Sequence, residues 1–263
     1  MIDIGVNLTN SRFDKDLNTV LSNACEYGVK HILVTGTNVN ESEKALALCQ
    51  QHQKLLSCTA GVHPHDADHV ADDYLARLQS LASHSAVKAI GECGLDFNRN
   101  FSTPVNQKRV FTEQVQLAQQ LQLPLFLHQR DAFDDWLSIL SPYISSVPFM
   151  ISHCFTGTSQ QLRLCLEAGM YIGITGWVCD ERRGQALRDI IHQIPLDKLM
   201  IETDAPYLTP RTIRPKPKSS RNEPKYLKYV VEEIAKLTDY SEPEIIQHTS
   251  ENANRVFGLR CTS

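Results

Sequence analysis

The chain has 263 residues, a length that either one α/β barrel or two smaller domains would fill. Hydrophobic residues make up 42% of the sequence and charged residues 21%, a globular balance that excludes a disordered or fibrous chain. The formal net charge of −4 excludes a uniformly basic nucleic-acid-binding protein, although an acidic protein can still carry a local basic patch.

The first residues lack the basic segment of a secretory signal, and no stretch reaches the roughly 18 apolar residues of a membrane span. We therefore expect a cytoplasmic protein that does not contact a membrane. The sequence has eight cysteines and no Cys-x-x-Cys pair, which in such a protein is typical of reduced, mostly buried thiols. These cysteines stand at positions 25, 49, 58, 93, 154, 165, 179 and 261.

Short β-rich runs alternate with longer amphipathic segments along the chain. The predicted strands are Met1–Leu8, His31–Thr35, Leu56–Val62, Val87–Cys93, Leu125–His128, Phe149–Cys154, Met170–Thr175 and Leu199–Thr203. Helical periodicity predicts helices that include Asp14–Tyr27, Glu41–His52, Asp72–Ala82, Asn106–Gln122 and Ser159–Ala168. Strands that alternate with helices pair in parallel through right-handed crossovers. Eight such units, without a glycine-rich nucleotide-binding fingerprint, predict one α/β domain over residues 1–263 with the TIM (β/α)8 barrel fold.

Titratable side chains follow five of the predicted strands. They are His63 and His65 after the third strand, Glu92 at the fourth, His128 at the fifth, His153 at the sixth and Asp204 after the eighth. Any one of them alone would more often be a hydrogen-bonded core or rim residue. Because the carboxyl ends of barrel strands form one rim, and because imidazole and carboxylate groups bind divalent metals, the set predicts a catalytic metal site.

The segment Pro206–Pro224 leaves the eighth predicted strand and contains five prolines and five Lys or Arg residues. A charge run is usually a solvated surface, but a long structureless loop in a compact domain is usually functional, so we favour a functional role for this one. With the nucleic-acid substrate that the family resemblance described next implies, the candidates for phosphate contact are Arg211, Arg214, Lys216, Lys218 and Arg221, with Arg99 and Arg130 elsewhere in the chain. With the same substrate, the candidates for stacking on an unpaired base are Phe97, Phe155, Trp177 and Tyr207.

Several long motifs resemble those of the TatD family of metal-dependent deoxyribonucleases, and the resemblance extends over essentially the whole chain. The motifs are Gly61–His65, Gly91–Phe97, His153–Gly157 and Glu202–Leu208, and Gly173–Gly184 resembles the TatD branch more than distant members. The resemblance implies an amidohydrolase-type barrel, phosphodiester hydrolysis and 3′→5′ exonuclease activity on single-stranded DNA and RNA, in DNA repair or nucleic-acid turnover. It also implies Mg²⁺ as the activating ion, with Mn²⁺ or Zn²⁺ as alternatives.

The same resemblance suggests roles for individual side chains. Glu92, His128 and His153 are implied as metal ligands, and Asp204 as the carboxylate that binds or activates the attacking water. A residue that only orients a histidine remains an alternative role for Asp204. His63 and His65 are candidates for contact with the scissile phosphate or with a second ion.

The chain departs from the wider family in the first predicted strand. Most members carry a His-x-His pair there, whereas this sequence has Gly5 and Asn7. Glycine offers no side-chain ligand and asparagine only a neutral oxygen, so we do not expect a tightly held second metal. A site poorer in imidazole also favours Mg²⁺ or Mn²⁺ over tightly bound Zn²⁺.

Two other functions compete with a nuclease that acts on single-stranded DNA or RNA. A metal-dependent hydrolase of a small amide or ester usually has the first-strand histidines and a bridging lysine, and no lysine follows the fourth predicted strand. A non-catalytic nucleic-acid-binding barrel is disfavoured by the intact set Glu92, His128, His153 and Asp204. We expect the protein to be a monomer.

Overall fold

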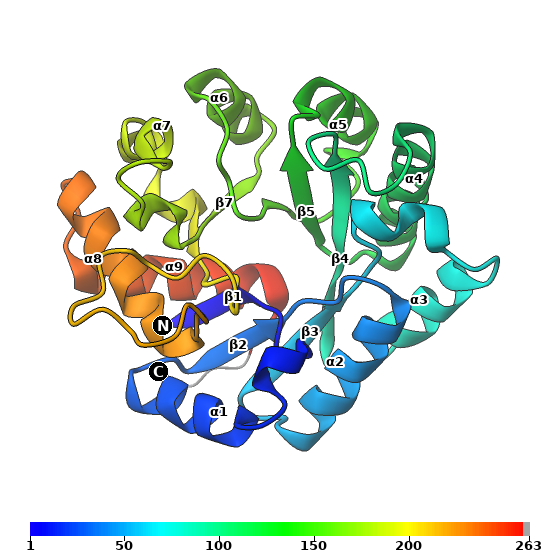
Figure 1. Cartoon of the computed structure of the whole chain (residues 1–263). Helices are drawn as coiled ribbons and strands as arrows, with labels where there is room; N and C mark the ends of the chain where they lie inside the picture. The colour runs from blue at the N-terminus through cyan, green and yellow to red at the C-terminus, as the bar shows by residue number, and fades with distance from the viewer. Residues whose placement is uncertain (260–263) are drawn as a thin grey trace. The chain divides into compact units, whose positions relative to one another are not determined.

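The computed structural model describes residues 1–259, in which eight strands alternate with helices (Figure 1). The strands are β1 (Ile2–Val6), β2 (His31–Val34), β3 (Leu56–Ala60), β4 (Val87–Asp96), β5 (Leu125–Arg130), β6 (Met150–Ser152), β7 (Tyr171–Ile174) and β8 (Leu199–Ile201). They follow one another in chain order through one sheet. All eight predicted strands are therefore confirmed, and β4 continues three residues beyond its predicted end.

Residues 1–259 form nine α-helices, five of which match the predicted amphipathic segments to within a few residues. They are α1 (Leu17–Glu26), α2 (Val39–Gln51), α3 (Tyr74–Ala82), α4 (Pro104–Leu121), α5 (Phe133–Leu140), α6 (Ser159–Glu167), α7 (Gln185–Arg188), α8 (Leu227–Leu237) and α9 (Glu242–Phe257). None of the helices in residues 1–259 is long and apolar enough to cross a membrane. No disulfide joins the seven cysteines of this part of the chain, and five of them are buried, whereas Cys261 lies outside the described residues.

The chain divides into two compact units. The first, here called the central unit, contains Val34–His153 and Glu167–Met170. The second, the terminal unit, contains Met1–Leu33, Cys154–Leu166 and the chain from Tyr171 onward.

In the central unit, β3, β4, β5 and β6 pair in parallel, with Gly94 opposite His128 in the register of β4 and β5. Helix α4 packs on β4 through the apolar face that the periodicity predicted, which includes Val110, Phe111, Val115 and Ala118. The pairing brings the last residues of four parallel strands to one edge, where the polar side chains follow.

Helix α4 also contributes two buried glutamines that hold the loops beside this edge. The Gln114 side chain accepts a hydrogen bond from the Val62 amide at 2.7 Å and donates one to the Val62 carbonyl at 3.0 Å. The Gln107 side chain accepts from the Asp96 amide at 2.9 Å and donates to the Asp96 carbonyl at 3.1 Å. Because buried backbone groups need partners, these amides fix the chain after β3 and at the end of β4.

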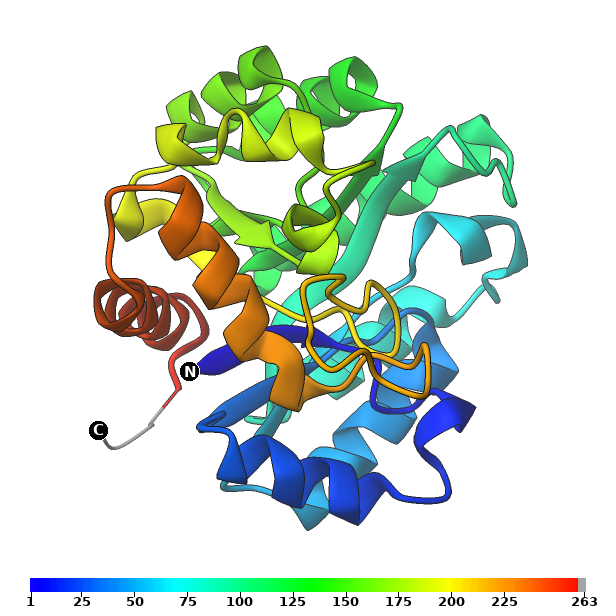
Figure 2. The ribbon, with the colours of Figure 1, turned by 60° about the vertical axis from the view of Figure 1, so that its left-hand side comes forward.

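In the terminal unit, β7 pairs in parallel with β8, and Val6 at the end of β1 forms a bridge with Ala205. Figure 2 shows the chain after β8 running as a long loop before it reaches α8. Residues 206–223 contain no helix or strand, so the predicted structureless segment is confirmed.

Asp3 on β1 is a buried carboxyl group beside the end of β8. Its oxygens accept hydrogen bonds from the backbone amide of Thr203 at 2.9 Å and from the Thr203 hydroxyl at 2.6 Å. Burial nevertheless raises the pKa of Asp3 to about 8, against the effect of these hydrogen bonds. The carboxyl group is therefore mostly protonated in the folded protein at neutral pH.

The raised pKa of Asp3 predicts a stability that falls with pH. Between pH 4 and 8 the unfolded chain loses the Asp3 proton while the folded protein keeps it, so the free energy of unfolding decreases as the pH rises. Asp3→Asn removes this titration, and we expect its stability relative to the wild type to increase by about 2 kcal/mol or more from pH 4 to pH 8. Urea denaturation at several pH values measures the difference. Parallel pH curves for the two proteins would contradict the assignment.

Candidate metal centre

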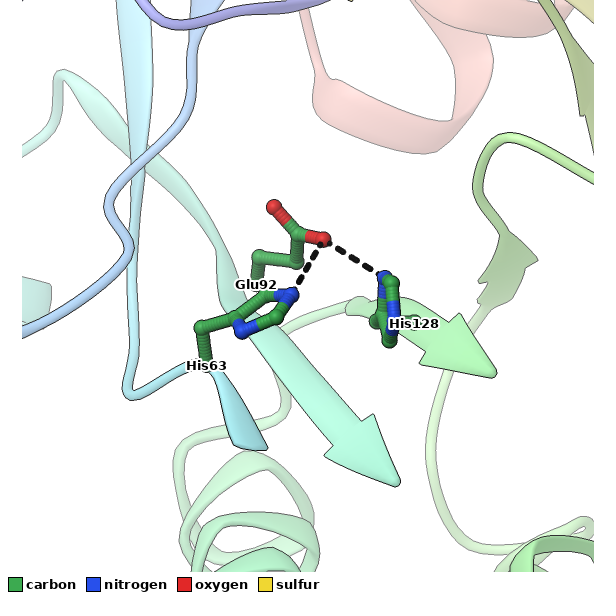
Figure 3. Close-up of side chains that lie close together, drawn as sticks. All are labelled: His63, Glu92 and His128. Atoms are coloured by element: carbon green, nitrogen blue, oxygen red, sulfur yellow. Dashed lines mark ion pairs between the residues drawn. The ribbon is translucent and has the colours of Figure 1, made fainter. Parts of the chain in front are cut away.

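Three histidines of the central unit converge on one carboxylate oxygen. Oε1 of Glu92 lies 3.0 Å from Nδ1 of His128 and 3.4 Å from Nε2 of both His63 and His153. Figure 3 shows His63 and His128 on either side of the Glu92 carboxylate. Glu92 and His153 are buried, and the other two imidazoles are half-buried. The structure thus brings together four of the side chains that the strand ends predicted, each from a different strand or from the residues just after it.

A close approach of β4 and β5 creates this geometry. Gly94 has a φ of +149°, and a Cβ atom there would lie 1.8 Å from the His128 carbonyl oxygen. Only glycine fits such a position, because both the contact and the positive φ exclude a side chain. The glycine therefore lets β5 carry His128 directly alongside the strand that bears Glu92.

Asp96, the last residue of β4, is a member of the site that sequence analysis missed. It is buried, and its Oδ2 lies 2.8 Å from Nε2 of His65 and 3.6 Å from Nε2 of His128. The other oxygen accepts hydrogen bonds from the backbone amides of Asn98 and Arg99. The sequence did contain a signal: because side chains alternate along a strand, Glu92 and Asp96 face the same side.

The electrostatics keep both carboxylates ionised. Burial alone would raise the pKa of Glu92, but the surrounding imidazoles of His153, His63 and His128 lower it well below its usual range. The pKa of Asp96 is also lowered, because the nearby imidazole of His128 and the hydrogen bond from His65 outweigh its burial. Burial lowers the pKa of His63 to about 4 despite the attraction of Glu92, so this imidazole is neutral at pH 7. For His128, the nearby carboxylates of Asp96 and Glu92 overcome burial and raise the pKa.

The neutral His63 ring has a defined tautomer. Its Nδ1 accepts a hydrogen bond from the backbone amide of His65 at 3.1 Å, where His63 caps a short 3-10 helix, Pro64–His69. A neutral imidazole carries a single N–H, which must then be on Nε2, the atom that faces Glu92. His63 is therefore a hydrogen-bond donor to this site, and it would have to break the turn to offer Nε2 as a metal ligand.

The remaining donor set fits a divalent cation. Without His63, that set is Glu92, His128 and His153, whose imidazole nitrogens lie 3.0 Å and 3.4 Å from Oε1 of Glu92. Within the described residues, Nε2 of His128 is one of a few buried side-chain atoms without a hydrogen-bond partner. Two ionised carboxylates beside imidazole nitrogens form the ligand chemistry expected of a catalytic metal site.

Asp204 belongs to the terminal unit, three residues after the end of β8. Its Oδ1 accepts a hydrogen bond from Nδ2 of Asn7 at 3.0 Å, and its backbone amide donates to the Gly5 carbonyl at 2.8 Å. The two residues that replace the His-x-His pair therefore hold this carboxylate in place. Because the Asn7 amide nitrogen is used in this way, its side chain orients Asp204 within the terminal unit.

The family model for TatD related DNase matches residues 2–258. The chain belongs to the TatD related DNase family. It is 51% identical over 259 residues to the "3'-5' ssDNA/RNA exonuclease TatD" of Pectobacterium carotovorum, which covers 98% of this chain and 100% of the relative. The protein of the same name from Salmonella typhimurium is 51% identical over 257 residues, covering 98% of each chain.

Solved structures of the family agree with the fold. A TatD homologue from Escherichia coli is 28% identical, with a TM-score of 0.89 over 98% of each chain. A TatD family hydrolase from Entamoeba histolytica is 27% identical, with a TM-score of 0.89 over 98% of this chain and 97% of that one. These similarities confirm the predicted TIM barrel of the metal-dependent hydrolase type. The TatD family is metal-dependent, and the central unit has a group of side chains able to hold a metal ion.

The basic side chains of the loop Pro206–Pro224 in this TatD-family chain differ in their surroundings. Arg221, a predicted phosphate contact, is instead bound to Asp16 through two hydrogen bonds of 2.8 and 2.7 Å and to Glu223 through one of 2.9 Å. Its guanidinium also lies 5.1 Å from the centre of the Phe13 ring. This arginine anchors the loop to the start of the chain and does not fit the role of a phosphate ligand.

The other basic candidates are exposed. Arg211 lies 3.6 Å from the Asp180 carboxylate, and Arg214 donates to carbonyl groups of its own loop. Exposed side chains in the central and terminal units that remain suited to phosphate contact are Arg99, Arg130, Arg211, Arg214, Lys216 and Lys218.

Most of the aromatic candidates are poorly placed for stacking. Phe155 is buried, and Phe97 and Trp177 are half-buried. Tyr207 is 48% exposed, and its hydroxyl accepts a hydrogen bond from the Asn10 side chain.

The different surroundings of Arg221 and Lys216 predict different effects of their removal. Arg221→Ala removes the hydrogen bonds to Asp16 and one partner of Glu223, which keeps its ion pair with Lys225, and we expect it to lower the free energy of unfolding by roughly 1–3 kcal/mol. The matched control Lys216→Ala removes an exposed charge from the same loop and should change stability by less than about 0.5 kcal/mol. Urea denaturation measures both effects. A stable Arg221→Ala variant whose binding to single-stranded DNA loses salt dependence would instead make Arg221 a phosphate contact.

Proposed function

We propose that this protein is a metal-dependent nuclease that hydrolyses phosphodiester bonds as a 3′→5′ exonuclease on single-stranded DNA or RNA. The observation that carries the proposal is the convergence of three imidazoles on Oε1 of Glu92 in a TatD-family chain. The relatives named as 3'-5' ssDNA/RNA exonucleases match this chain over nearly its full length, which supports the substrate class.

Glu92, His128 and His153 are the proposed metal ligands, and Mg²⁺ is the proposed ion. Hard cations such as Mg²⁺ prefer oxygen ligands and substrate phosphates, and the first strand offers no imidazole here. Gly5 has no side chain and Asn7 binds Asp204, so neither supports a tightly held second ion. Mn²⁺ fits the same donors, and Zn²⁺ is a weaker candidate.

A bound divalent cation would polarise the phosphoryl oxygen and lower the pKa of a bound water. Glu92 supplies its ionised carboxylate to hold that charge. Nε2–H of His63, which faces Glu92 here, is a ready donor to a non-bridging phosphate oxygen. Asp204, oriented by Asn7, is the proposed general base that takes the proton of the attacking water as the bond from phosphorus to the leaving oxygen breaks.

The remaining candidates are proposed to hold the substrate. His65, fixed by Asp96, lies beside His63 and is proposed to contact the same phosphate. Arg130, Arg211 and Arg214 are proposed to contact phosphates further along the strand. A cytoplasmic location, a monomeric state and a role in DNA repair stay predictions from the sequence.

The function is tested with a 3′-labelled single-stranded oligonucleotide, in Mg²⁺ and in EDTA. We expect the wild type to release mononucleotides from the 3′ end in Mg²⁺ alone, and to cut a blunt duplex poorly because its terminal bases must first unpair. Glu92→Gln keeps the shape of the side chain but removes its charge, and should lower activity by roughly 10³-fold or more while the protein stays folded.

Glu43→Gln is the matched control, because Glu43 is a surface carboxylate paired with Arg77 in the same unit. It should retain wild-type activity. Near-normal turnover by Glu92→Gln in saturating Mg²⁺ would refute the metal assignment, and wild-type cleavage of amide or ester substrates without nuclease activity would favour the small-molecule hydrolase.

A further inference from the structure

One exposed aromatic side chain lies against the candidate metal centre. Phe101, in the loop between β4 and α4, is 59% exposed. Its ring meets His65 edge to face, with the ring centres 4.7 Å apart. The centre of the His65 ring lies 4.2 Å from that of His63, which in turn lies 4.4 Å from that of His128. A continuous row of rings therefore connects Phe101 to a proposed metal ligand.

The loop holds Phe101 in this exposed position. Next to it, Ser102 is buried, and its hydroxyl donates to the His65 carbonyl at 2.8 Å and accepts from the Asp68 amide at 3.0 Å. The Asp68 carboxylate accepts hydrogen bonds from the backbone amide and the hydroxyl of Thr103, both at 2.9 Å. Because its anchored neighbours already hold Phe101 in this position, ordering the side chain on ligand binding costs less conformational entropy.

The positively charged side chain of Arg99 lies close to the Phe101 ring. The backbone amide of Arg99 is fixed by the Asp96 carboxylate at 2.8 Å, and its exposed guanidinium lies 5.8 Å from the centre of the Phe101 ring. An exposed aromatic face with an adjacent cation is the combination that binds unpaired nucleotides, because every base has a face that can stack and every linkage carries a negative charge.

We infer that Phe101 is the stacking platform for the base of the 3′-terminal nucleotide, and that Arg99 contacts the backbone beside it. This inference rests on the proposed nuclease function and adds a specificity element to the same site. The row of histidines runs from the Phe101 ring to Glu92 and His128, and the inference places the phosphate of this nucleotide at these residues and its base at the ring. A base that is paired in a duplex cannot occupy this platform, because the complementary nucleic-acid strand would have to enter the site with it.

The inference is tested by combining two enzymes with two substrates. One oligonucleotide carries a normal 3′-terminal nucleotide, and the other an abasic residue at that position. We expect the wild type to prefer the normal end by roughly 5- to 100-fold in kcat/KM, the range that base stacking on an aromatic side chain supplies. Phe101→Ala should abolish this preference by raising KM for the normal end, and Phe101→Tyr should restore it.

Val105→Ala is the matched control, because Val105 is 77% exposed near the same anchored segment but has no aromatic ring. It should keep the preference for the normal end. Binding is measured separately with 2-aminopurine at the 3′ end and Glu92→Gln as the background, in which Phe101 should quench the fluorescence and Phe101→Ala should not.

The failures of the two proposals are distinguishable. A wild type with no Mg²⁺-dependent cleavage of single strands refutes the proposed function. An active wild type whose preference and quenching are unchanged in Phe101→Ala refutes the platform and leaves the nuclease function standing. A preference that depends on the base of the penultimate nucleotide alone also refutes the platform as placed here.

Discussion

A buried carboxylate needs compensating partners, and the site of this protein is organised around that requirement at Glu92. Placing its charge among apolar strands would be unfavourable without the imidazoles of His63, His128 and His153 on one oxygen. The same arrangement suits a divalent cation, since the carboxylate and the nitrogens already point to one place. Asp96 adds a second carboxylate at the end of β4, and this carboxylate holds the His65 imidazole. Each histidine is thus oriented by a carboxylate or by the backbone before any ligand is bound.

The precision of the site comes from α4 as much as from the strands. Its apolar face packs on β4, while Gln114 and Gln107 bind the backbone at Val62 and Asp96. The first of these contacts lies one residue before His63, and the second holds the carboxylate that positions His65. A helix that appears from its periodicity to serve packing alone therefore also sets the positions of groups expected to contact the substrate.

The sequence predicted the strands well, because buried parallel strands are short apolar runs and the polar residues after them were easy to recognise. It also predicted that His63, Glu92, His128 and His153 would meet, since parallel strands end at one edge. It could not predict partners set by tertiary structure: Arg221 was expected to bind phosphate but is bound by Asp16, 205 residues away in the chain. Nor could it rank the aromatic side chains, because exposure depends on how a loop is anchored. Phe101 was overlooked while the buried Phe155 was proposed.

We propose that Glu92, His128 and His153 hold a single catalytic cation while His63 remains a hydrogen-bond donor. Pulsed electron paramagnetic resonance of Mn²⁺ bound to the protein, with natural and ¹⁵N-labelled histidine, tests it directly. The account predicts histidine nitrogen couplings that change on labelling, weaken in His128→Gln and persist in His63→Gln. Mn²⁺ without histidine coupling, or coupling that is lost only in His63→Gln, would contradict it.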